Sequence, residues 1–283
     1  MKKILALFLV FSLAPLKSWT EETIQDRLRN KKLVAAHQGG VFDGTPNTLQ
    51  LFEHARRNGA DIIEMDLHLS KEGIPVVFHD DTLDSLTDCQ GKVSDLTVAE
   101  LKKCEISFVF RGGNIPTFEE VLQWNNGRII LNAEFKVPEA VVPAIRLVEK
   151  YKAYSSVYFQ TKGDPQLYTS ARSQNPKVAL LFAPPNVESL NWALSLNDDF
   201  LVVIELHENL RTKEIIDAIH RAHKWASENS WHWRFDHEFF GVSCAEGFYE
   251  IGLDILVSNR PKQCGADRAD FRISLKAKDY NPR

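Results

Sequence analysis

Acidic side chains gather at the ends of two predicted strands in this sequence. Glu64 and Asp66 lie two residues apart, and Glu134 closes a later strand. Residues two apart on a strand point to the same face, so Glu64 and Asp66 lie side by side. Isolated buried carboxylates carry a large desolvation cost, which a hard divalent cation with oxygen ligands relieves. A metal site is therefore favoured, with an ion pair to Lys136 or Arg128 as the alternative.

Two histidines flank these carboxylates. His37 ends the first predicted strand, and His79 ends the run from Pro75. That run must fold back as a hairpin after the second strand, because a parallel crossover needs about a dozen residues. The hairpin brings His79 roughly opposite Asp66. One imidazole on each side of a metal suits displacement at phosphorus, where one ring withdraws a proton and the other protonates the leaving oxygen. Taken alone, either histidine could instead be a hydrogen-bonded residue of the core or of a loop. Taken together at converging strand ends, they predict an acid/base pair.

The elements that must position these residues alternate between short β-branched runs and helical patterns. This alternation predicts an α/β fold, a TIM-type (βα)8 barrel with a hairpin after the second strand. In such barrels the functional groups sit at the C-terminal ends of the strands. The predicted strands are Leu33–His37, Asp61–Leu67, Arg128–Glu134, Ser156–Thr161, Val178–Phe182, Leu201–Glu205, Phe239–Cys244 and Ile255–Ser258.

Composition divides the chain into segments. Residues 1–20 have a basic start and a short apolar run, typical of a secretory signal, with an uncleaved N-terminal anchor as the alternative. Residues 21–32 form a lead-in and residues 33–262 the barrel, with 81–127 as an elaboration over its mouth. Residues 263–283 form a polar tail. The protein is therefore expected to be exported, periplasmic or secreted.

Four cysteines make an even count in a chain that is expected to be exported, which favours disulfides. The sequence neighbours are the favoured pairs, Cys89 with Cys104 and Cys244 with Cys264. A zinc site is the competing interpretation, and it lacks any CxxC pair.

The overall charge indicates the kind of partner. The 283 residues carry a formal net charge of -4 and a pI near 6.2, so there is no electrostatic case for nucleic acid. A small molecule or a lipid headgroup is expected instead. His207, just past a predicted strand, is placed to contact substrate at the barrel mouth, with a loop role as the alternative. The aromatic segment Trp231–Phe240 suits either a membrane surface or packing against the barrel. Nothing in the sequence favours one oligomeric state.

Short motifs in a fixed order cover nearly everything after Lys32. They are His37–Gly39, Pro46–Leu49, Gly59–Asp66, Gly73–Asp80, Leu96–Leu101, Ile115–Leu122, Glu134–Lys136 and Gly252–Pro261. Each is weak alone, but in this order they resemble the glycerophosphodiester phosphodiesterases. The resemblance implies a distorted TIM barrel that uses one divalent metal ion, Ca²⁺ or Mg²⁺, to cleave glycerophosphodiesters to glycerol 3-phosphate and an alcohol. The roles it implies are acid and base for His37 and His79, metal ligands for Glu64, Asp66 and Glu134, and phosphate binding for Lys136.

Two positions depart from the family pattern. Gln38 stands where the family has Arg, so a cationic contact in the substrate site is replaced by an amide. Pro46 stands where the family has a metal-ligating Glu, and Asp43 is a nearby substitute. Three acidic ligands are also typical of the related sphingomyelinase D and phospholipase D-like enzymes, which cleave lysolipids or sphingolipids through a cyclic phosphate. A weakly active or inactive barrel that binds phosphodiesters is a further alternative.

Overall fold

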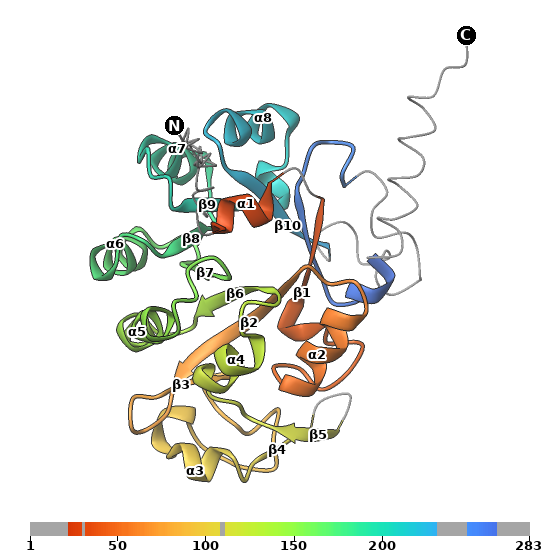
Figure 1. The fold of residues 1–283 in the computed structure, drawn as a ribbon, viewed down its shortest axis with the longest axis vertical. Coiled ribbons are helices and arrows are strands. Elements are labelled where there is room, and N and C mark those ends of the chain that lie inside the picture. Colours follow the sequence, from red (N-terminus) through yellow and green to blue (C-terminus); the bar gives the residue numbers. More distant parts are fainter. Residues whose placement is uncertain (1–21, 30–31, 108–110, 231–247, 265–283) are drawn as a thin grey trace, which may run out of the picture.

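A closed barrel of parallel strands forms the centre of the protein (Figure 1). The computed structural model describes residues 22–29, 32–107, 111–230 and 248–264. The barrel strands follow the order β1-β11-β10-β9-β8-β7-β6-β2, and β2 pairs with β1 to close the ring. Their bounds are β1 Leu33–Ala36, β2 Ile62–Leu69, β6 Ile130–Phe135, β7 Val157–Gln160, β8 Ala179–Phe182, β9 Leu201–Leu206, β10 Trp225–Asn229 and β11 Ile255–Ser258. The predicted α/β barrel is confirmed.

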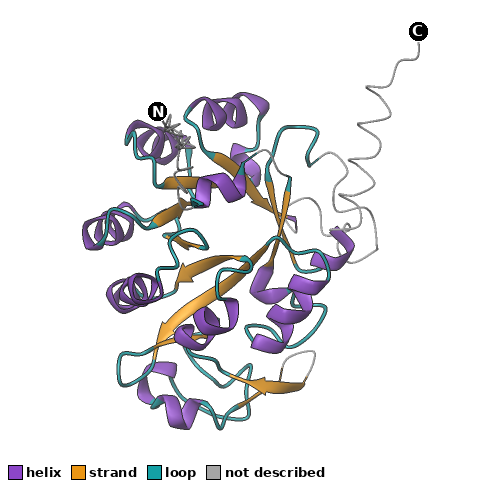
Figure 2. Cartoon of the chain, in the orientation of Figure 1, coloured by secondary structure: helices purple, strands orange, loops and turns teal. Residues whose placement is uncertain are grey.

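Helices surround the barrel on its outer side (Figure 2). Most begin at a Ser, Thr, Asp or Asn side chain that accepts a hydrogen bond from the first turn, as Thr48 does from the Leu51 N–H. Their bounds are α1 Ile24–Leu28, α2 Leu49–Arg57, α3 Val98–Leu101, α4 Phe118–Asn125, α5 Val141–Tyr151, α6 Pro165–Gln174, α7 Val187–Ser195 and α8 Lys213–Arg221.

The alternation of side chains along β2 separates the core from the site. Ile63, Met65 and Leu67 point outward into the apolar layer between the strands and the helices. Glu64 and Asp66 point to the opposite face, inside the barrel. Because this period of two is strict, the same strand anchors the outer core and presents two carboxylates to the interior.

The N-terminal end of the barrel is closed by apolar side chains. Ile24 and Leu28 of α1 pack against Leu33, Ile62 and Ile255 in a second apolar cluster. Each of these five side chains is at most 2% exposed. Burying a Leu or Ile side chain contributes about 1.5–3 kcal/mol to the free energy of folding, so the packing of α1 against this end of the barrel is stable. The polar interior is therefore accessible from the C-terminal end of the strands.

The hairpin predicted after the second strand is confirmed. β3 (Pro75–Val77) pairs antiparallel with β2, with Leu67 opposite Val77. The main-chain N–H of Phe78 then donates to the Asp66 carbonyl over 3.1 Å. This register places the next residue, His79, at the same end of β2 as Asp66.

The prediction for the seventh barrel strand was wrong. The place between β9 and β11 is taken by β10, Trp225–Asn229, whereas Phe239–Cys244 lies outside the described residues. The β10 sequence contains no β-branched residue and carries Ser227 and Glu228 at fully buried positions. Ser227 shares the barrel-facing side with Trp225 and Asn229, whereas Glu228 lies on the outer side with Ala226, so neither face shows the apolar pattern of a strand.

A small lobe beyond β3 is stabilised by its own apolar cluster (Figure 1). It contains α3 and the antiparallel pair β4 (Glu105–Ser107) and β5 (Arg111–Asn114). The helix that follows, α4, packs on the barrel through Phe118 and Val121. The segment 81–127 thus contains both the lobe and a helix of the barrel wall.

A disulfide joins Cys89 to Cys104 within this lobe, as predicted. Cys244 lies outside the described residues, so its pairing with Cys264 stays a prediction. The lobe is small, and a covalent link between residues 15 apart restricts the unfolded chain.

Removing this link is expected to weaken the protein measurably. In the double variant Cys89→Ser/Cys104→Ser, the free energy of unfolding should fall by about 2–3 kcal/mol, the value for closure of a loop of this length. Urea unfolding followed by circular dichroism measures the change. An unfolding midpoint equal to that of the wild type would show that the disulfide contributes nothing to stability.

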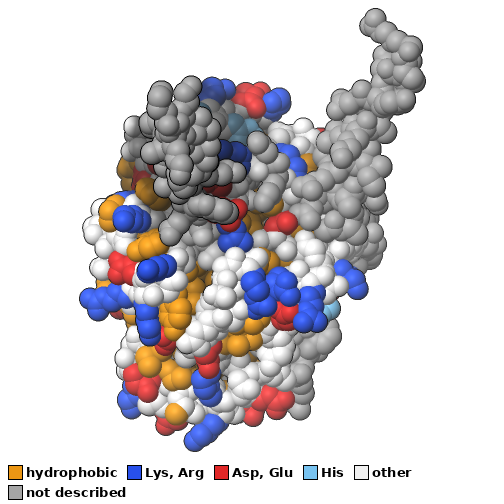
Figure 3. All heavy atoms as spheres, in the orientation of Figure 1, with side chains coloured by type: hydrophobic (Ala, Val, Ile, Leu, Met, Phe, Trp, Pro, Cys, Tyr) orange, Lys and Arg blue, Asp and Glu red, His pale blue; other side chains and the backbone are white. Residues whose placement is uncertain are grey.

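Charged side chains of both signs are interspersed over the face shown in Figure 3. Large apolar side chains that are exposed are few among the described residues, namely Ile74, Val142 and Val187. No described helix is long and apolar enough to cross a bilayer. Residues 1–21 and Trp231–Phe240 lie outside the described residues, so the predictions made for them stay predictions.

Candidate active site

Three carboxylates meet at the C-terminal end of adjacent strands. Glu64 and Asp66 come from β2 and Glu134 from β6, and the Cα atoms of Asp66 and Glu134 are direct register partners. Each residue offers an oxygen atom, and these atoms all lie within 4.8 Å of one another. Glu64 and Asp66 are 4% and 1% exposed. The structure therefore brings the predicted acidic trio together, with Glu64 and Asp66 buried and Glu134 partly exposed.

Two lysines lie against this trio. Lys136 Nζ is 3.2 Å from Asp66 and 2.9 Å from Glu134, so the ion pair named as the alternative to a metal site also forms. Lys162 Nζ lies 3.1 Å from Glu134. The sequence analysis missed Lys162, although it comes directly after the predicted strand Ser156–Thr161 and so met the criterion of a polar strand end.

The electrostatics of the trio reflect crowding of negative charge. Burial raises the pKa of Glu64 well above its usual range, and the charges of Asp66 and Glu134 raise it further. Burial by itself would lower the pKa of Lys136, but the two carboxylates beside it raise it. Lys136 therefore stays protonated and offsets part of the negative charge.

The donor set fits a hard divalent cation. Ligand atoms about 2.4 Å from one ion are at most about 4.8 Å apart, and the three carboxylate oxygens all lie within 4.8 Å of one another. Asn47, which precedes α2, donates from Nδ2 to Asp66 over 2.8 Å. Its Oδ1 is buried and has no hydrogen-bond partner among the described residues. The three carboxylates thus offer oxygen ligands alone, the chemistry that Ca²⁺ and Mg²⁺ prefer, and Asn47 orients Asp66.

His37 is held at the end of β1 by a single-turn 3-10 helix. Its Nδ1 lies 2.7 Å from Oδ1 of Asn259, a residue just past β11. Gln38 has a φ of 50°, and its main-chain N–H donates to Glu64 over 2.7 Å. Burial lowers the pKa of His37, and the charge of His79 acts more weakly in the same direction. The neutral form of His37 is therefore favoured, with its Nδ1 occupied by Asn259.

His79 is oriented by its neighbours on the lobe side. Its Nδ1 lies 2.6 Å from Oδ1 of Asp80, whose other oxygen accepts a hydrogen bond from Ser85 over 2.7 Å. Nε2 of the buried His68 contacts the His79 carbonyl over 3.2 Å. Asp80 thus holds the His79 ring through Nδ1, and His68 holds the His79 main chain through its carbonyl.

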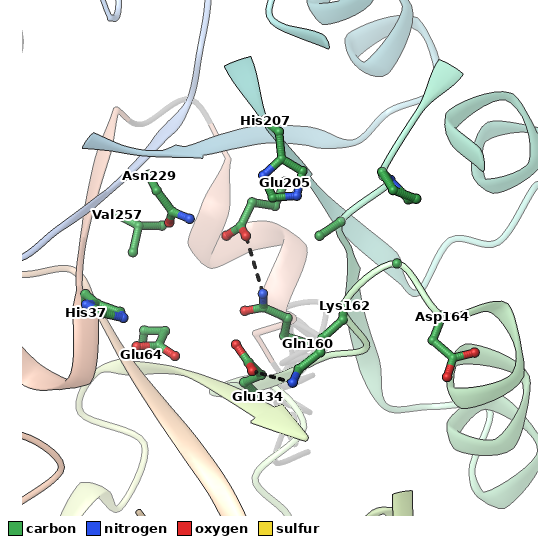
Figure 4. A pocket seen from close by; sticks show the side chains of 13 residues that line it. His37, Glu64, Glu134, Gln160, Lys162, Asp164, Glu205, His207, Asn229 and Val257 are labelled. Atoms are coloured by element: carbon green, nitrogen blue, oxygen red, sulfur yellow. Dashed lines mark hydrogen bonds and ion pairs between the residues drawn. The ribbon is translucent and has the colours of Figure 1, made fainter. Parts of the chain in front are cut away.

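A cavity of about 550 Å³ opens beside the trio (Figure 4). His37, Glu64 and Glu134 line one side; His207 also lines the cavity, and its contact with substrate stays a prediction. Gln160 lies between Glu134 and Glu205 in Figure 4. The remaining lining includes Lys162, Asp164 and Asn229. Its size is in the range of small-molecule sites.

Several predicted site residues lie elsewhere. Gln38 does not line this cavity; its described polar contact with the trio is made by the main chain. Asp43, the suggested replacement for the carboxylate missing at Pro46, is not part of the acidic trio. Lys136 contacts the trio without lining the cavity.

Comparison with known proteins places the chain in a family. The model of the glycerophosphoryl diester phosphodiesterase family matches residues 37–179, just over half of the 283 residues. The chain belongs to this family. The matched segment contains the trio, both histidines and Lys136.

Individual members of the family are similar over different lengths. A glycerophosphodiester phosphodiesterase of Bacillus altitudinis is 38% identical over 203 residues, covering 66% of this chain and 81% of that protein. One from Caldanaerobacter subterraneus is 36% identical over 132 residues, covering 44% and 54%. Human glycerophosphodiester phosphodiesterase 1 is 34% identical over 119 residues, covering 40% and 36%. The match thus spans about half of the Caldanaerobacter protein and about a third of the human one.

Solved structures of the family share the barrel. A glycerophosphoryl diester phosphodiesterase from Parabacteroides distasonis matches with a TM-score of 0.75 at 21% identity, covering 88% of this chain and 93% of that one. A phosphodiesterase of Oleispira antarctica, solved in complex with the product sn-glycerol-3-phosphate, matches with a TM-score of 0.70 at 22% identity, covering 84% and 96%. At these identities the likeness concerns the fold.

Proposed function

We propose that the protein is a metal-dependent phosphodiesterase that hydrolyses glycerophosphodiesters to glycerol 3-phosphate and an alcohol. The observation that carries this proposal is the buried trio Glu64, Asp66 and Glu134 beside the cavity that His37 lines. Family membership and the product found in the Oleispira antarctica structure support the same substrate class.

The trio would hold Ca²⁺ or Mg²⁺. When bound, the ion would polarise the phosphoryl oxygens and stabilise the charge that develops on them. Lys136 and Lys162 add positive charge at the same place. Both ammonium groups now pair with Glu134, so each is positioned to contact an anionic phosphodiester. The phosphate would therefore sit in the cavity beside Lys162 and His37, with Lys136 contributing its charge from behind Glu134.

His37 is suited to accept the proton of the nucleophile. Its Nδ1 lies against the side-chain oxygen Oδ1 of Asn259, which can only accept, so Nδ1 carries the hydrogen. In the neutral ring Nε2 then carries the lone pair and can accept a proton. Burial, which disfavours the charged ring, keeps this form available at neutral pH.

His79 is suited to protonate the leaving alcohol. The Asp80 carboxylate, 2.6 Å from Nδ1, stabilises a positive charge on the ring and fixes its orientation. A charged His79 can donate from Nε2 and return to the neutral form. The two histidines therefore differ in their hydrogen-bond partners, an amide for the base and a carboxylate for the acid.

Asp80 should matter for turnover through His79 alone. Asp80→Asn keeps the size of the side chain but removes the charge, so kcat should fall by about 10- to 100-fold with little change in KM. The alkaline limb of the kcat profile, where the general acid loses its proton, should move to lower pH as well, which a purely structural role would not produce. Asp81→Asn is the matched control. Asp81 is an exposed neighbour of Asp80, and its imidazole contact is with His68 Nε2, at 3.8 Å, rather than with His79. Equal effects of both changes would contradict the positioning role.

Product analysis tests the proposed function. The protein is incubated with a glycerophosphodiester and with lysophosphatidylcholine, each with Ca²⁺, Mg²⁺ or a chelator, and products are followed by phosphorus NMR. Glycerol 3-phosphate is the expected product. A cyclic lipid phosphate would favour the sphingomyelinase D-like alternative, and binding without turnover in any metal would favour a barrel that only binds phosphodiesters.

The compartment is also part of the proposal. The Cys89–Cys104 disulfide supports export to an oxidising environment, where such bonds persist.

A further inference from the structure

Glu205 is a buried carboxylate that the reaction described above does not use. It lies near the end of β9, is 4% exposed, and lines the active-site cavity. Figure 4 shows it across the cavity from Glu64 and Glu134. Its Oε1 accepts a hydrogen bond from Gln160 Nε2 over 3.3 Å. A carboxyl group thus faces the cavity on the side away from the trio.

No described Lys, Arg or His side chain forms an ion pair with Glu205. The neighbouring buried acid Glu228 differs, because Arg211 lies 2.8 Å from it. Burial, then the charges of Glu134 and Glu228, raise the pKa of Glu205 to about 8. A buried carboxylate without a counter-charge is costly, and a cationic ligand would remove that cost.

We propose that Glu205, Gln160 and Asn229 form a subsite for a primary ammonium group on the alcohol part of the substrate, as in an ethanolamine ester. The inference rests on the proposed phosphodiesterase function. A primary ammonium group has three N–H donors; Glu205 offers its carboxylate, and Gln160, whose Nε2 donates to Glu205, offers its Oε1. Gln160 is held in place from both sides, since Asn132 Nδ2 lies 3.4 Å from its Oε1.

The charges of the cavity match a zwitterion. The lysines that pair with Glu134 lie at the phosphate end, and Glu205 lies at the other. A quaternary ammonium group has no N–H and is usually held by aromatic rings. None of the described residues that line this cavity is Phe, Tyr or Trp. The subsite therefore favours ethanolamine over choline.

Substrate competition tests the subsite. The wild type is expected to have a kcat/KM for glycerophosphoethanolamine at least about tenfold above that for glycerophosphocholine or glycerophosphoglycerol, a difference of about 1.4 kcal/mol. In Glu205→Gln these ratios should fall to about one. Asp217→Asn is the matched control and should keep the wild-type ratios, because Asp217 pairs with Lys213 on the exposed side of α8. Ratios that are unchanged in Glu205→Gln would overturn the proposal.

Calorimetry separates this inference from the proposed function. Phosphoethanolamine and ethyl phosphate differ by an ammonium group, and both are titrated into the Ca²⁺-loaded protein. Phosphoethanolamine should bind at least about tenfold more tightly to the wild type, and the difference should vanish in Glu205→Gln. Equal affinities in the wild type would overturn the subsite even if the variant failed to fold. Absence of turnover with every diester would instead overturn the proposed function, and this titration would still decide on the subsite.

Discussion

Replacing Glu64 with glutamine is expected to stabilise the metal-free protein and nearly to abolish turnover. Without a cation, burial and the neighbouring carboxylates disfavour the charged form of Glu64, so removing its charge relieves repulsion. Glutamine keeps an oxygen atom for the Gln38 N–H. The same change removes a metal ligand, so kcat should fall by about three orders of magnitude, which corresponds to about 4 kcal/mol.

Two melting curves measure both effects of this change. With chelator, the Tm of Glu64→Gln should lie above that of the wild type; with excess Ca²⁺, the order should reverse, because binding to the folded state stabilises it. Glu53→Gln is the matched control, since Glu53 pairs with Arg56 and Arg57 at the surface of α2. Surface ion pairs contribute about 0–1 kcal/mol, so Glu53→Gln should keep the Ca²⁺ response. An equal Ca²⁺-induced rise in Tm for Glu64→Gln and the wild type would contradict the metal site.

Replacing either active-site histidine with alanine is expected to lower kcat by about two to four orders of magnitude, the usual range for general acid and base catalysis. The two variants should differ with the leaving group. Nitrophenolate leaves without protonation, so His79→Ala should recover most of its rate on the p-nitrophenyl ester of glycerol 3-phosphate. His37→Ala should stay slow on this ester, because the nucleophile still has to lose a proton.

His54→Ala is the control for these variants, because His54 lies on the outer helix α2 rather than at the barrel interior. Near-wild-type turnover in either variant would remove that histidine from the mechanism. Recovery of His37→Ala, but not of His79→Ala, on the nitrophenyl ester would exchange the two roles.

The barrel and the acidic trio could be predicted because both follow from local patterns. The alternation in β2 places Glu64 and Asp66 on one face, and parallel strands bring their ends together, which adds Glu134. The hairpin followed from the shortness of the connection before β3. These parts of the site could be predicted from the alternation of side chains along a strand and from the parallel or antiparallel pairing of neighbouring strands.

Other parts depend on tertiary contacts that a linear pattern does not contain. β10 was missed because its buried Glu228 is compensated by Arg211, a residue from the loop before α8. The partner of His37 is Asn259, more than two hundred residues away in sequence. Glu205 closes the predicted apolar strand Leu201–Glu205, and only the tertiary structure brings Gln160 and the cavity next to it.

Removal and return of the metal tests the central claim most directly. Protein stripped with a chelator is mixed with a glycerophosphodiester, and phosphorus NMR is recorded before and after Ca²⁺ or Mg²⁺ is added in excess. The account predicts no glycerol 3-phosphate from the stripped protein and its formation once the ion is restored, with little formed by Glu64→Gln at the same metal concentration. Formation of glycerol 3-phosphate at an equal rate with and without the ion would contradict it.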